Sequence, residues 1–134
     1  MTAPSHPSIN EQITYLTTRD LATSSHFYGE IMGLEKVHEQ PSCHIFRIGP
    51  ACYIACNERQ LMSQEPTRLT YTIVSDDVDG WYDFLQSRGV TFVKPPTYSD
   101  VNKTYSCLFH DPNGYRVVIQ EFRDPDWPGP LAST

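Results

Sequence analysis

Hydrophobic and polar positions in the first half of the chain alternate between strand and helix patterns. The stretch Gln12 to Thr18 is rich in β-branched and aromatic residues, which predicts a strand. Apolar residues then recur at helical spacing between Asp20 and Gly33, where Asp20 suits the cap and Gly33 the left-handed residue after the end. Three more predicted strands complete a βαβββ unit: Glu35 to His38, Cys43 to Ile48, and Ala51 to Cys56.

The same order of elements returns after a polar segment, residues 57–68, which is typical of a linker. Leu69 to Ser75 is a predicted strand, and a helix follows that ends at Gly89. Its acidic start at residues 76–79 is better explained by capping than by a metal cluster, because free amides and the helix dipole favour anions there. The remaining predicted strands are Val90 to Lys94, Thr104 to Phe109, and Tyr115 to Phe122.

The two units, residues 12–56 and 69–122, match in spacing as well as in order. Asp20 and Asp76 are 56 positions apart, and so are Gly33 and Gly89. Chance matches between common cap and stop residues are the alternative, but an internal duplication explains the agreement more economically.

Composition narrows the class of protein. The 134 residues fit one globular domain, and 39% hydrophobic with 12% aromatic residues are enough for a packed core. A net charge of −6 without a basic stripe argues against nucleic-acid binding. We expect a cytoplasmic protein without a membrane span, because no signal pattern or long apolar run is present. The four cysteines form no Cys-x-x-Cys pair and are interpreted as small buried thiols.

Three stretches of this pattern resemble a known superfamily, the glyoxalase, bleomycin-resistance and extradiol-dioxygenase proteins, also called vicinal oxygen chelate proteins. They are Thr17-Thr18-Arg19-Asp20-Leu21 with His26-Phe27-Tyr28 and Met32-Gly33-Leu34, Asp76-Asp77-Val78-Asp79 with Arg88-Gly89-Val90, and Phe109-His110-Asp111-Pro112-Asn113-Gly114-Tyr115. The resemblance covers about Ile13 to Phe122. It implies an α+β fold in which two tandem βαβββ modules form curled mixed sheets around a cavity, with helices on the outer faces, and usually a homodimer.

The resemblance also implies where a metal would be bound in metal-dependent members: by His or Gln on the first strand of each module, and by Glu on a last strand. Here the first position falls on Ile13, and the equivalent in the second module falls within residues 68–70, none of which is a usual ligand. The glutamate position falls on Val118, with Gln120 on the same strand face as a weak donor. We therefore expect no metal and no other cofactor, although a register slip of one residue would bring Gln12 or Glu121 inward.

Strand parity and the nearby loops give the candidate ligand-binding residues. They are Ile13, Tyr15, His44, Arg68, Thr70, Tyr105, Val118 and Gln120. His44 is the histidine to consider as a proton carrier, if it faces the cavity and has a partner to orient it. Packing is the alternative explanation for each of these residues, and no catalytic residue is assigned.

The leading hypothesis is metal-independent binding or sequestration of a small organic molecule, similar to bleomycin-resistance proteins. The alternative is a metal-dependent glyoxalase-like lyase or isomerase, or an extradiol-type dioxygenase. A third hypothesis is an interaction module whose extended tail, residues 123–134, wraps a partner subunit through Trp127 or frays.

Overall fold

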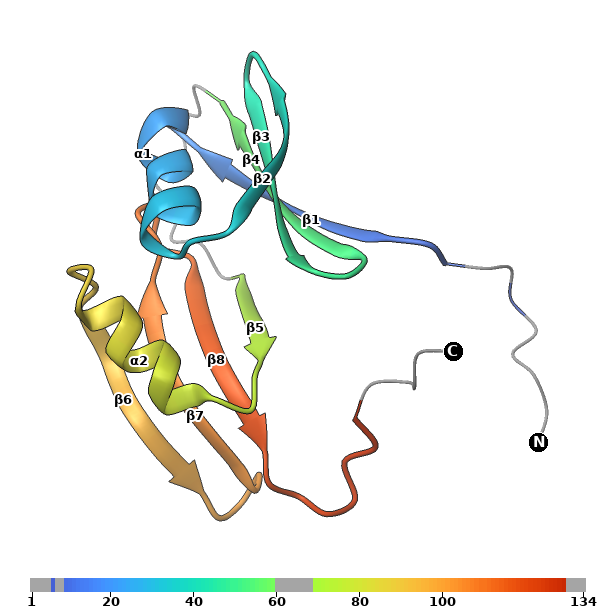
Figure 1. The fold of residues 1–134 in the computed structure, drawn as a ribbon, viewed down its shortest axis with the longest axis vertical. Coiled ribbons are helices and arrows are strands. Elements are labelled where there is room, and N and C mark those ends of the chain that lie inside the picture. Colours follow the sequence, from blue (N-terminus) through green and yellow to red (C-terminus); the bar gives the residue numbers. More distant parts are fainter. Residues whose placement is uncertain (1–5, 7–8, 60–68, 130–134) are drawn as a thin grey trace. The chain divides into compact units, whose positions relative to one another are not determined.

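A computed structural model describes residues 6, 9–59 and 69–129 of the chain. The chain divides into two compact units, Met1–Ser63 and Gln64–Thr134, and the predicted modules fall one in each. The elements of each unit follow a βαβββ order (Figure 1).

Unit 1 carries one four-stranded sheet, called sheet A, in the order β1-β4-β3-β2. Strands β1 and β4 pair in parallel, and the other two pairings are antiparallel. Helix α1 contacts β3 and β4 and so covers one face of this sheet. Its elements are β1 (Gln12–Thr18), α1 (Leu21–His26), the π-helical turn η1 (Phe27–Ile31), β2 (Glu35–Gln40), β3 (Cys43–Gly49) and β4 (Cys52–Glu58).

Unit 2 repeats this plan in sheet B, ordered β5-β8-β7-β6, with β5 and β8 parallel. Helix α2 contacts β6, β7 and β8 and covers one face of sheet B. Its elements are β5 (Thr70–Val74), α2 (Val78–Gln86), β6 (Phe92–Ser99), β7 (Thr104–His110) and β8 (Arg116–Phe122). The predicted α+β class, two βαβββ modules with mixed sheets and helices, is therefore confirmed.

Both helices are capped by an aspartate, as the sequence predicts, but in the second helix the cap is Asp77 and not Asp76, which the spacing argument matched with Asp20. The side chain of Asp20 accepts a hydrogen bond from the amide of Thr23, and Asp77 accepts one from Gly80. The φ angles of Gly33 and Gly89 are 74° and 89°, in the region where a side chain causes strain. Each helix is thus fixed at its start by a carboxylate and ended by a glycine.

Several boundaries differ from the sequence prediction, and three of the differences have a clear structural basis. The first helix changes to π-helical hydrogen bonding after His26, with the amide of Met32 donating to the carbonyl of Phe27. Strand β4 runs on to Glu58, which the prediction placed in the linker, because its backbone stays paired with β1 as far as Thr18. The Glu58 carboxylate also accepts a hydrogen bond from the amide of Leu21 at the start of α1.

The third difference is β6, which extends to Ser99 through Pro95 and Pro96, residues that the prediction left in a loop. Proline lacks the amide that a central strand must donate, but β6 lies at the edge of sheet B and its pairing shifts between Lys94 and Thr97. An edge position therefore admits both prolines.

The tail described by residues 123–129 keeps contact with its own unit. The ring of Trp127 stacks on Phe122 with centroids 3.8 Å apart and planes 13° from parallel. No helix in the described parts of the chain is long and apolar enough to cross a membrane.

The four cysteines are free thiols, of which Cys43, Cys56 and Cys107 are buried and Cys52 is half-buried. Burial raises the pKa of Cys107 to about 11 and also raises the pKa of Cys43. Because the folded state holds the Cys107 proton more tightly, its contribution to stability is complete below about pH 9 and is lost as the pH rises through about 11.

We expect a thiol reagent such as Ellman's reagent, at mildly alkaline pH, to modify Cys52 quickly and the other three thiols only on unfolding. Replacing Cys52→Ser should remove the fast phase, and Cys107→Ser should leave it. The measurement is the absorbance of the released thiolate with and without denaturant. Fast modification of Cys107 in the folded protein would contradict the burial described here.

Candidate functional site

Within the described residues of unit 1, a helix covers one face of sheet A and not the other, and a hydrogen bond identifies which is which. The hydroxyl of Ser24, on α1, donates to the hydroxyl of Thr18, on β1, at 2.8 Å, and both residues are buried. Side chains alternate along a strand, so Thr18 and Leu16 point toward α1 while Ile13, Tyr15 and Thr17 point to the other side. We call that other side the helix-free face of sheet A.

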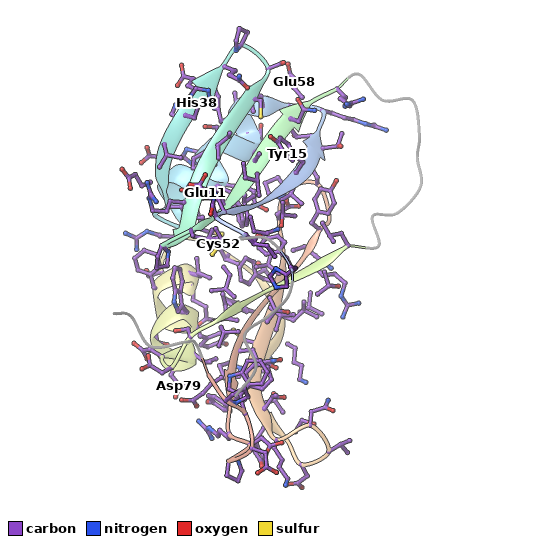
Figure 2. All side chains as sticks on the ribbon, turned by 90° about the vertical axis from the view of Figure 1, so that its right-hand side faces the viewer. Glu11, Tyr15, His38, Cys52, Glu58 and Asp79 are labelled. Atoms are coloured by element: carbon purple, nitrogen blue, oxygen red, sulfur yellow. The ribbon has the colours of Figure 1, made fainter. Side chains whose placement is uncertain are left out.

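Two apolar side chains on this face are open to solvent. Ile13 is 38% exposed and Tyr15 is 61% exposed, although both lie within a regular strand. Figure 2 shows the Tyr15 side chain standing on β1. Tyr15 pairs with Ala55 on β4, and the small neighbour leaves the aromatic ring accessible from the side. This face therefore offers an aromatic surface for a ligand.

A chain of polar contacts crosses the same face. The hydroxyl of Tyr53, on β4, donates to the Glu11 carboxylate at 2.7 Å and accepts from the Arg47 guanidinium at 3.4 Å. Arg47 in turn donates to Glu35 at 3.3 Å. The hydrogen bond to Glu11 is the main reason why the pKa of Tyr53 is raised, with desolvation adding to it. These four residues hold oriented donors and acceptors next to the aromatic surface.

The helix-free face of sheet B is identified in the same way. The hydroxyl of Tyr105, on β7, donates to the Asp79 carboxylate of α2 at 2.5 Å, so the odd-numbered positions of β7 face the helix. Val118 pairs with Thr72 and Leu108, and Gln120 pairs with Val74 and Ser106, so all of them lie on the other side. Thr70, two residues before Thr72, shares that face.

These strand faces decide the question of register slippage. Glu121, the nearest carboxylate on β8, pairs with Tyr105 on the helix-covered side and accepts a hydrogen bond from Arg123 at 2.8 Å. Gln12 likewise alternates away from Ile13 and donates to Thr14 at 2.8 Å. The helix-free faces therefore carry five of the candidate residues, Ile13, Tyr15, Thr70, Val118 and Gln120.

The residues at the expected metal positions do not fit a metal. Ile13 and Val118 are aliphatic, and Thr70 offers only a neutral hydroxyl, which is a weak ligand. Within residues 6, 9–59 and 69–129, no three His, Cys, Asp or Glu side chains form a group that could hold a metal ion. No step of chemistry is therefore assigned to a metal at these positions.

The structure places two candidate residues elsewhere. His44 does not share the face of Ile13: its Nδ1 lies 2.9 Å from the Ser25 hydroxyl of α1, on the helix-covered side. Tyr105 faces α2 rather than the mouth of a cavity, because its hydroxyl is held by Asp79 and the Arg123 guanidinium lies 4.1 Å from its ring centre. Arg68 lies outside the described residues.

The sequence analysis did not predict the polar contacts that link Glu11, Tyr53, Arg47 and Glu35 on sheet A. Tyr53 lies beside Ile13 because the two are partners in the parallel pair of β1 and β4, and alternation along β4 does not reveal that register. Arg47 is aligned with both Tyr53 and Glu35 by the antiparallel register. That register depends on a shift between Arg47 and Gly49, for which the sequence carries no clear signal.

A comparison with protein families agrees with this architecture. Residues 9–119 match the model of the Glyoxalase/Bleomycin resistance protein/Dioxygenase superfamily, which is most of the chain. The chain belongs to this superfamily. Two curated relatives in it are metallothiol transferases FosB, from Staphylococcus haemolyticus (26% identical, covering 80% of this chain and 78% of the relative) and Staphylococcus saprophyticus (28% identical, covering 84% and 75%).

Solved structures of superfamily proteins share the fold. A glyoxalase/bleomycin resistance protein/dioxygenase from Nocardioides has a TM-score of 0.75 at 23% identity, over 97% of this chain and 93% of that one. A lactoylglutathione lyase from Agrobacterium tumefaciens has a TM-score of 0.70 at 22% identity, over 89% and 95%. At this level of sequence identity, the similarity shows a shared fold and does not show a shared activity.

We expect Glu11→Gln to lower the pKa of Tyr53 toward its ordinary value, because the variant removes the carboxylate that accepts the phenol proton. Ultraviolet titration of the phenolate checks this, with Tyr53→Phe identifying which of the 8 tyrosines moves. As a matched control, Glu30→Gln removes the same charge from the exposed end of η1 and should leave the titration curve unchanged. An unshifted Tyr53 in Glu11→Gln would contradict the contact.

Proposed function

We propose that this superfamily member binds a small, flat, partly polar organic molecule without a resident metal. The observation that carries the proposal is the pair Ile13 and Val118, two aliphatic residues at positions where the family resemblance implies metal ligands. Both lie on helix-free faces, so the side chains available there offer contact surface rather than coordination.

The helix-free face of sheet A supplies the binding groups in this proposal. The exposed ring of Tyr15 stacks on a planar ligand, and Ile13 adds apolar contact. Tyr53 and Arg47 provide hydrogen-bonding groups whose orientation is already fixed by Glu11 and Glu35, which lowers the entropy lost on binding. A cavity formed by both modules, a homodimer and a cytoplasmic location remain predictions from the sequence.

The rival function is a metal-dependent enzyme, and the relatives are the specific reason to keep it. Those at 26% and 28% identity are named metallothiol transferases, and one protein of the same fold is named a lactoylglutathione lyase. A glyoxalase-like lyase or isomerase, or an extradiol-type dioxygenase, would need ligands other than the residues at positions 13, 70 and 118.

Elemental analysis separates the two functions. Protein purified without added metal should contain far less than one equivalent of Zn, Ni, Mn or Fe, and titration calorimetry with Mn²⁺ or Ni²⁺ should show no tight site. A near-stoichiometric metal that chelator removes, together with turnover of a hemithioacetal or oxygen uptake with catechol, would overturn the proposal in favour of the rival.

A substitution at Tyr15 tests whether the ligand binds on the helix-free face of sheet A. Ligand-detected NMR with naphthol, indole and benzamide should find a binder, and Tyr15→Ala should weaken it roughly 2- to 10-fold, the value of one aromatic contact. Tyr98→Ala is the matched control, because this tyrosine is also exposed (44%) but shares the face of Tyr105. Equal weakening by both variants would place the ligand elsewhere.

A further inference from the structure

Three side chains of unit 1 form a cluster on the helix-covered face of sheet A, away from the proposed ligand face. The Ser25 hydroxyl of α1 lies 2.9 Å from Nδ1 of His44 on β3. Nε2 of the same imidazole lies 4.0 Å from a carboxylate oxygen of Glu39 on β2. A hydroxyl, an imidazole and a carboxylate therefore lie in a row in space, with the imidazole in the middle.

The pairing of β2 with β3 and the position of α1 together hold this arrangement. Glu39 and His44 are direct partners in the antiparallel pairing of β2 and β3, so their side chains share one face. Ser25 lies in the last turn of α1, which ends at His26, and the π-helical turn η1 begins at the next residue, Phe27. Such π-helical turns are frequent at functional sites.

We propose that Ser25 is an activated nucleophile that accepts acyl groups from small activated esters, with His44 as its general base and Glu39 as the residue that orients the imidazole. The negative charge of Glu39 favours the tautomer with its proton on Nε2. Nδ1 is then free to accept the proton of the Ser25 hydroxyl. This assignment is independent of the ligand face and of any metal.

The chemistry balances with these groups and water alone. The Ser25 oxygen attacks the ester carbonyl carbon while its proton passes to Nδ1 of His44. The tetrahedral intermediate collapses, the bond to the leaving alcohol breaks, and His44 returns the proton to that alcohol. Water then attacks the acyl-serine, with His44 taking a proton from the water and giving it to the departing Ser25 oxygen.

Charge and access around the imidazole agree with this role. Lys36 donates to Glu39, and this contact is the main reason why the pKa of Glu39 lies below its ordinary value, so the carboxylate stays ionised at neutral pH. Cys56 is the partner of His44 on its other side, on β4, and is buried. The His44 side chain is 16% exposed and Ser25 is half-buried, so both are partly open to solvent.

The test is covalent labelling by p-nitrophenyl acetate followed by peptide mass mapping. Ser25 should be acetylated faster than the exposed serines Ser42 and Ser87 in the same sample. His44→Gln should slow labelling of Ser25 on the order of 100-fold, the usual contribution of a general base. The reaction should also slow in D₂O, which a purely structural role for His44 does not predict.

Two further variants keep the proposal falsifiable if His44→Gln fails to fold. Glu39→Gln should slow labelling only a few-fold, because the carboxylate is exposed and 4.0 Å away. Glu30→Gln, which removes the same charge from η1, should leave the rate unchanged. Labelling of Ser25 no faster than Ser42 and Ser87, labelling on His44 alone, or equal rates in the Glu39 and Glu30 variants would overturn the proposal.

Discussion

The contact between each sheet and its own helix fixes which side chains are available for binding. In unit 1 the hydroxyls of Thr18 and Ser24 join β1 to α1, and in unit 2 the phenol of Tyr105 joins β7 to α2. Because side chains alternate with a period of two, each hydrogen bond assigns every residue of its strand to one face or the other. A slip by one residue would separate these partners and exchange the two faces completely.

Much of the fold follows from local signals in the sequence. Asp20 and Gly33 mark the ends of the first helical segment, and Asp77 marks the start of the second, because capping depends on residues three or four apart. The strand extension to Glu58 depends on pairing with β1, and the passage of β6 through Pro95 depends on an edge position. Both features depend on tertiary contacts, which local sequence patterns do not reveal.

The sequence alone could place a candidate-site residue only where alternation along a single strand determines which face of the sheet its side chain is on. Ile13 and Val118 are placed by counting along one strand from a turn, and the structure puts both on helix-free faces. His44 was misplaced because the parity of a middle strand becomes fixed only when its partner helix is known, here through Ser25. The contact between Tyr53 and Arg47 depends on a register shift within β3 and β4, which alternation alone does not reveal.

The two prolines in β6 have a consequence for how the protein behaves at high concentration. An edge strand with a full set of amides is a template on which another chain can add a strand, which is a common route to fibrous aggregates. Pro95 and Pro96 supply no amide hydrogen over two successive residues, and the bulge around them interrupts the regular spacing. This rim of sheet B is therefore a poor template for the addition of a further strand from another polypeptide.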